Sequence, residues 1–150
     1  LWLIPPLAAG AAVGIHLALT PARKAEAALI ARVTLIGLAV DVLLIALDII
    51  ALSHPAEPFW LLHALWFASL WAAFATTLNA SLRWLRGRML LAAVFGAIGG
   101  PLAYLAGQRL GAVSLPRGTL SFIILALEWA CLMPPLVHLA SRLPAPEAPR

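Results

Sequence analysis

The sequence has very little cysteine and very little charge. One cysteine, Cys131, occurs in 150 residues, which excludes an intrachain disulfide and any CxxC metal or redox motif. Charged residues make up 11% of the chain, where about 25% is usual for a soluble domain. The basic residues lie at the ends of apolar runs, with no basic stripe that carries interleaved aromatic residues, so no nucleic-acid partner is expected. HExxH, GxSxG, phosphate-loop and dinucleotide-binding motifs are also absent from the sequence.

Apolar residues are correspondingly abundant in the sequence. They make up 63% of the chain, and the mean hydropathy is +0.99. A soluble protein of this size cannot bury so much apolar side chain, because small domains keep a large surface. The composition therefore predicts an integral membrane protein. It argues against a secreted disulfide scaffold, a disordered tail and an ordinary cytosolic domain.

The charged residues divide the chain into five apolar segments. Each is long enough to cross ~30 Å of hydrocarbon as a helix, the form that satisfies its backbone polar groups within lipid. We predict transmembrane helices over 1–19, 27–52, 59–82, 89–108 and 118–140. Short connections predict an all-α, up-and-down transmembrane bundle over residues 1–142. The Pro-rich tail, 143–150, is expected to be disordered.

The basic residues predict the orientation of the bundle. Eight lie on one side: Arg23, Lys24, Arg32, Arg83, Arg86, Arg88, Arg142 and Arg150. Two, Arg109 and Arg117, lie on the other. The positive-inside rule then places the C-terminus in the cytoplasm and the start of the first helix outside. Because the sequence opens on Leu1 without a basic leader, we expect one upstream helix that this sequence lacks.

Small residues recur at helical spacing in two of the segments. Segment 89–108 carries Ala92, Gly96 and Gly100, and segment 59–82 carries two parallel rows of Ala, Ser and Thr. Such seams let the backbones of neighbouring helices approach closely within lipid. Helix packing is the favoured interpretation of both seams.

A few polar residues fall within the predicted spans, and counting outward from turns near Pro55 and Gly87 estimates their depth. Asp41 should lie at mid-depth, near Ser69, Trp71 and Tyr104. An outer layer should contain Asp48, His63 and Arg109. An inner layer should contain Arg32, Thr76, Asn79 and Glu128. Asp41 and Asp48, seven residues apart, should share one helix face.

These layers have two interpretations. Internal pairing that fixes the register of the helices is favoured, and a proton path or an acid–base site at Asp41 or Glu128 is the alternative. No metal or cofactor is predicted, although His16, His63 or His138 leave a bound tetrapyrrole open as a minor possibility. A further cluster is typical of contact with anionic lipid head groups: Arg83, Trp84, Arg86 and Arg88.

Four stretches carry a family resemblance: FATTLN at 74–79, SLRWL at 81–85, GGPLAY at 99–104 and AGQRLGA at 106–112. Together with His16 and Asp41, they resemble the bacterial inner-membrane proteins catalogued as domain-of-unknown-function family 2878. The resemblance spans nearly the whole chain and implies a small multi-pass protein of the bacterial inner membrane. The family's motifs contain several candidate site residues, to which the resemblance assigns no role: Asp41, Thr76, Thr77, Asn79, Tyr104 and Arg109.

The leading functional hypothesis is a non-catalytic accessory, scaffold or lipid-binding subunit of a membrane assembly. Its partners would be membrane lipids and other membrane protein subunits. One alternative is a membrane-embedded enzyme that modifies lipid acyl chains, with Asp41 or Glu128 as base and Asn79 or Arg109 positioning the substrate. A small proton-coupled transporter is the other. A cleft that reaches Asp41 would favour the enzyme, and a paired Asp48–Arg109 layer would favour the scaffold.

Overall fold

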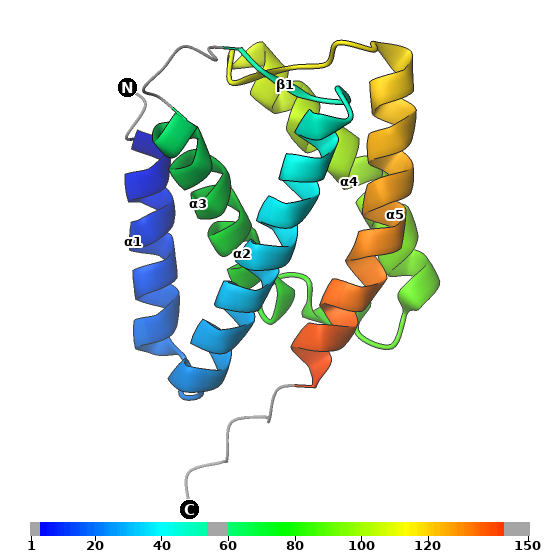
Figure 1. The fold of residues 1–150 in the computed structure, drawn as a ribbon. Helices are drawn as coiled ribbons and strands as arrows, with labels where there is room; N and C mark the ends of the chain where they lie inside the picture. Colours follow the sequence, from blue (N-terminus) through cyan, green and yellow to red (C-terminus); the bar gives the residue numbers. More distant parts are fainter. Residues whose placement is uncertain (1–3, 54–59, 143–150) are drawn as a thin grey trace, which may run out of the picture.

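The computed structural model describes residues 4–53 and 60–142. Its helices are α1 (Ile4–Leu19), α2 (Arg23–Ala46), α3 (Trp60–Leu78), α4 (Met89–Arg109) and α5 (Thr119–Ser141). Successive helices run in opposite directions along the bundle (Figure 1), so the predicted all-α, up-and-down fold is confirmed. The expected turn around Pro55 and the tail 143–150 lie outside the described residues.

Four of the helices, α2 to α5, are long and apolar enough to cross a membrane. Helix α1 is equally apolar but shorter, with 16 described residues. Large aliphatic side chains such as Leu7, Leu35, Leu90 and Leu127 are exposed on the outer faces of the helices. In water such a surface would be an aggregation hazard, whereas lipid solvates it. The fold is therefore that of a membrane protein.

Helix α2 ends at Ala46, well before the predicted end at residue 52. Asp48 adopts a left-handed conformation, with φ of 57°. The Asp48 N–H donates to Ile45 O at 3.0 Å, and the Ile49 N–H donates to Leu44 O at 2.9 Å. This is a Schellman cap, a common way for a helix to end. Asp48 therefore lies outside the helix, and the expectation that it shares a helix face with Asp41 is wrong.

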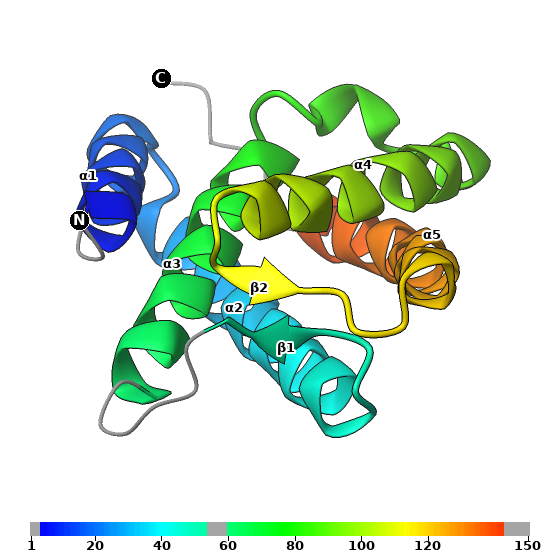
Figure 2. The ribbon, with the colours of Figure 1, turned by 90° about the horizontal axis from the view of Figure 1, so that it is seen from above.

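A short β-ladder closes the end of the bundle opposite the last turn of α5. Strands β1 (Ala51–Leu52) and β2 (Val113–Ser114) pair antiparallel, with Ala51 opposite Ser114 and Leu52 opposite Val113. The ladder lies across the helix ends when the bundle is seen from above (Figure 2). Nearby, Ser121 Oγ donates to Ile49 O at 2.7 Å. These contacts tie the end of α2 to the start of α5.

At the opposite end, α3 stops at Leu78 instead of the predicted residue 82. The chain then turns into the 3₁₀ helix η1 (Arg83–Leu85) before α4 begins. The hydroxyl groups of Thr76 and Thr77 donate to Ala73 O at 2.7 Å and Phe74 O at 2.6 Å. Both threonines thus bond within their own helix.

The helices pack in two groups. Helix α3 packs against α1 and α2, whereas α4 packs chiefly against α5. Consecutive helices α3 and α4 make few close contacts, and they diverge when seen from above (Figure 2).

The predicted glycine seam of α4 is the contact surface for α5. A Cβ atom on Gly96 would lie 2.3 Å from Trp129 O, and one on Gly100 would lie 2.2 Å from Trp129 Cγ. Ala92, on the same face, is fully buried. The interpretation of this seam as a packing device is confirmed.

Candidate functional site

Asp41 is the most deeply buried acidic residue of the described spans, with 2% of its surface exposed. The Trp71 indole N–H donates to Asp41 Oδ2 at 2.6 Å, and the Tyr104 hydroxyl donates to Oδ1. These three side chains come from α2, α3 and α4, so one carboxyl group links both groups of helices. The contacts agree with the depth that turn counting assigned to Asp41.

Helix α5 adds Glu128 and Trp129 to this centre. The carboxyl groups of Glu128 and Asp41 lie close enough to interact electrostatically. Both Glu128 oxygens are buried and receive no hydrogen bond from the part of the chain that the structure describes. Trp129 stacks on Trp71, with ring centroids 5.1 Å apart and planes 2° from parallel. The edge of the arrangement is closed by Phe74, which packs at right angles to Trp129 at 5.5 Å.

A cavity of about 480 Å³ reaches Asp41. Six aromatic side chains line it: Trp66, Phe67, Trp71, Phe74, Tyr104 and Trp129. The rest of its wall is aliphatic apart from Asp41, and it includes Leu70 of α3, Ala103 and Ala106 of α4, and Leu110 directly after α4. The cavity thus occupies the space that the divergence of α3 and α4 leaves. Small-molecule sites have this character, with an apolar wall and a small number of polar groups.

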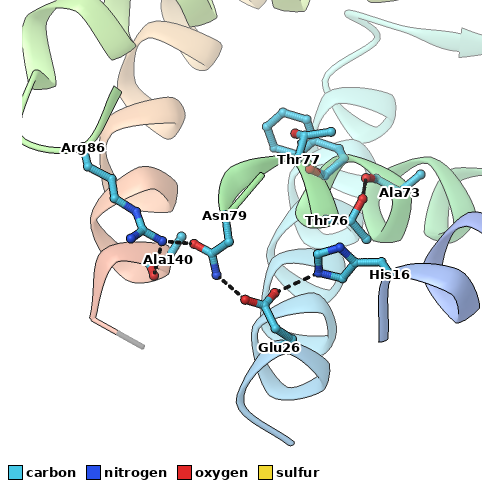
Figure 3. A network of polar contacts seen from close by, with 9 residues as sticks. His16, Glu26, Ala73, Thr76, Thr77, Asn79, Arg86 and Ala140 are labelled. Carbon is cyan, nitrogen blue, oxygen red and sulfur yellow. Dashed lines mark hydrogen bonds and ion pairs between the residues drawn. The ribbon is translucent and has the colours of Figure 1, made fainter. Parts of the chain in front are cut away.

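A second polar cluster lies at the end of the bundle where α1, α3 and α5 finish (Figure 3). Glu26 is buried at its centre, and its Oε2 lies 3.2 Å from His16 Nε2. Asn79 Nδ2 donates to Glu26 Oε1 at 2.6 Å. Arg86 Nη2 donates to Asn79 Oδ1 and, at 3.5 Å, to Ala140 O. This network connects α1, α2 and α5 through Asn79, which directly follows α3, and Arg86, which directly follows η1.

The structure rearranges the two predicted polar layers. Asp48 is exposed and pairs with Arg117, whose Nε lies 3.9 Å from Oδ2. Arg109 is exposed at the end of α4, and His63 is buried in α3. The paired Asp48–Arg109 layer is not found among the described residues, where Asp48 pairs with Arg117. A scaffold layer built on that pair is therefore not present in the described residues.

The inner layer also divides. Asn79 belongs to the Glu26 network, Glu128 lies beside Asp41, and Arg32 is exposed on α2. Sequence reasoning treated Glu26 as a loop residue and so missed its role. The sequence does place Glu26 and His16 on either side of a short connection between two helices. Because the chain reverses direction there, the two side chains can meet.

The residues predicted to touch lipid head groups do not all remain free for that contact. Arg83, Trp84 and Arg88 are exposed, and Trp84 packs edge-on against Phe95. Arg86 is half-buried and bonded to Asn79.

The histidines considered as tetrapyrrole ligands make contacts within the chain. His16 pairs with Glu26, and His138 Nε2 accepts a hydrogen bond from Arg142 Nε at 3.0 Å. Within the described ranges, no three His, Cys, Asp or Glu side chains are grouped so that they could hold a metal ion.

A comparison with protein families matches the chain to one of them. The family model described as "Protein of unknown function (DUF2878)" matches residues 1–135. This match includes Asp41, Trp71, Tyr104 and Glu128, and with them the whole aromatic cavity. No curated protein and no solved structure matches the chain.

Proposed function

The chain belongs to the DUF2878 family, and we propose that it is a membrane protein that binds a bilayer-soluble molecule in the cavity at Asp41. One observation carries this proposal, the cavity of about 480 Å³ with its wall of aromatic and aliphatic side chains. Its volume lies in the range of about 300–1,000 Å³ typical of small-molecule sites. A wall of this kind favours a ligand that already dissolves in lipid.

The position of the cavity suggests how the ligand enters. Its wall comes largely from α3 and α4, which make few contacts with each other. The outer faces of the helices carry exposed aliphatic side chains that lipid would surround. A molecule that diffuses in the bilayer could therefore pass between α3 and α4 without crossing a polar surface. Of the hypotheses raised by the sequence, this geometry favours a lipid-binding subunit.

The polar contacts of the site favour binding over catalysis. Both oxygens of Asp41 accept hydrogen bonds that hold α3 and α4 to α2, which is a structural use of the carboxyl group. The enzyme hypothesis keeps one observation in its favour, since Asp41 lines the cavity and Glu128 lies next to it. Asn79 and Arg109, its proposed substrate-positioning residues, do not line the cavity.

We place the protein in the bacterial inner membrane, with the C-terminal end of the bundle in the cytoplasm. Most of the basic residues belong to the connections and helix ends on that side, as the positive-inside rule requires. Other membrane protein subunits are the partners that this proposal allows.

The experiment is to identify what the purified protein carries. The chain is purified in mild detergent, and the bound small molecules are extracted and quantified by mass spectrometry. Ala106→Phe fills the cavity, and Ala39→Phe on the exposed face of α2 is the matched control. We expect one bilayer-derived molecule to accompany the wild type and the control and to be depleted in Ala106→Phe. Equal amounts in all three proteins would contradict the proposal.

A further inference from the structure

We propose that the molecule bound in the cavity is a lipophilic organic cation, whose positive charge is received by Asp41 and whose apolar groups pack against the aromatic wall. This inference rests on the proposed function and names the class of its ligand. The argument has two parts, the charge of the site and the nature of its wall.

Among the residues that the structure describes, the site has acidic groups and no Arg or Lys side chain to balance them. Within the described part of the chain, the donors to Asp41 are the uncharged Trp71 and Tyr104 side chains. Glu128, beside it, has two buried oxygens without a donor among the described residues. None of the described residues that line the cavity is basic. A carboxyl group inside a membrane span ordinarily pairs with a cation or holds a proton.

Basic residues that the structure describes in or beside the spans are paired elsewhere or exposed. Arg86 bonds to Asn79 and Ala140 at one end of the bundle, and Arg117 pairs with Asp48 at the other. Arg32 and Arg109 are exposed. Since no described Arg or Lys side chain supplies a positive charge to Asp41 and Glu128, a bound molecule would supply it.

The wall of the cavity suits a cation as well as an apolar group. Three of the six aromatic side chains are tryptophans, Trp66, Trp71 and Trp129. The electron-rich face of an indole ring attracts a cation more strongly than other aromatic rings do, and a site shielded from water strengthens the attraction. Proteins use aromatic cages of this kind to bind quaternary ammonium groups.

Ligands of other classes would interact favourably with fewer of the groups in the site. A plain acyl chain would pack against the rings but would bring no positive charge to the carboxyl groups of Asp41 and Glu128. An anionic amphiphile would be repelled by the same groups. A proton is the remaining partner for Asp41 and Glu128, and a bound cation would then replace it at the same place.

Two ions of nearly the same shape and opposite charge make the test selective. Tetraphenylphosphonium and tetraphenylborate are titrated separately into the full chain in detergent micelles, and binding is followed by calorimetry against protein-free micelles. We expect saturable binding of tetraphenylphosphonium and only background signal from tetraphenylborate. Bound tetraphenylphosphonium should also displace the molecule that accompanies the purified protein.

Variants connect the selectivity to the carboxyl groups. Glu128→Gln removes a charge without removing a hydrogen bond, so its fold should survive. It should weaken tetraphenylphosphonium binding about tenfold, as loss of a charge interaction in a dry site would. Asp41→Asn should weaken it further. Asp48→Asn, which changes an exposed carboxyl group outside the cavity, is the matched control and should bind like the wild type.

The outcomes separate this inference from the proposed function. Equal binding of the two ions, or binding that Glu128→Gln and Asp41→Asn leave unchanged, would overturn the choice of a cation and leave an apolar ligand in place. Binding of neither ion would also overturn it, while the molecule extracted from the purified protein would still decide the proposed function.

Discussion

Asp41 connects three helices through its two carboxyl oxygens. Trp71 approaches from α3 and Tyr104 from α4, so the carboxyl group fixes the distance between helices that otherwise make few contacts. Each donor is buried, and neither could find water as a substitute within a bilayer. Asp41 is therefore a structural residue of the bundle and also forms part of the cavity wall.

Replacing Tyr104 by Phe removes one of these hydrogen bonds and keeps the ring. We expect the free energy of unfolding to fall by about 0.5–2 kcal/mol, the range for hydrogen bonds between membrane helices. Denaturation with sodium dodecyl sulfate, followed by circular dichroism, measures the change. Asp48→Asn, at an exposed position, should leave the stability within error. If Tyr104→Phe left the free energy of unfolding unchanged, the hydrogen bond would not be what holds α4 to α2.

Glu26 is the corresponding residue at the other end of the bundle. Glu26→Ala leaves Asn79 Nδ2 and His16 without their acceptor, and we expect a loss of about 1–3 kcal/mol. Once Glu26 is gone, Asn79→Ala should cost less than in the wild type, because only its hydrogen bond from Arg86 is then lost, so a double-mutant cycle should show coupling between the two positions. Strictly additive losses in this cycle would contradict the network.

The residues of these centres differ in how well the sequence predicts them. Turn counting placed Asp41 near Trp71 and Tyr104, because depth follows directly from position in an antiparallel helix pair. It assigned Glu128 to the inner layer, but Glu128 lies beside Asp41, because depth counted along the chain does not include how α5 is tilted and rotated about its axis. Rotation is set by packing, here by Gly96 and Gly100 against Trp129, and not by position along the helix.

At the scale of elements, the helices follow from the apolar runs but their ends do not. The predicted end of α2 at residue 52 assumed that a helix continues until charge or proline stops it. Asp48 ends the helix earlier because a single left-handed residue closes the cap. The strand pairing of Ala51 with Ser114 joins segments far apart in sequence, and no local pattern indicates it.

The glycine seam between α4 and α5 gives a prediction at this scale. Gly100→Ala places a methyl group 2.2 Å from Trp129 Cγ, so the two helices must separate or the indole must move. We expect a destabilisation of about 1–3 kcal/mol, as for other overpacked sites.

Gly14→Ala on α1 is the control for this change. A Cβ at Gly14 meets no atom within 4 Å, so the substitution should be neutral or slightly stabilising. The same detergent denaturation compares both variants. Equal stability of the Gly100→Ala and Gly14→Ala proteins would show that the seam does not carry the packing of α4 on α5.

The whole molecule consists of two groups of helices that meet around a space. Asp41, the Trp71–Trp129 stack and the β-ladder join the groups, and the cavity lies between them. Composition and charge predict a bundle but cannot predict this space, because it arises from the divergence of α3 and α4. The central claim is that a bilayer-soluble molecule occupies it.

Labelling with a neutral, bilayer-soluble aryl diazirine tests that claim most directly. After photolysis in proteoliposomes, the labelled positions are mapped by mass spectrometry in the wild type, Ala106→Phe and Ala39→Phe proteins. We predict labelling at the cavity-lining Trp66, Phe67 and Trp71, which are buried or half-buried, in the wild type and the control, and its loss in Ala106→Phe. Exposed Leu90 should be labelled in all three. Cavity labelling that is absent from the wild type, or that persists in Ala106→Phe, would contradict the account.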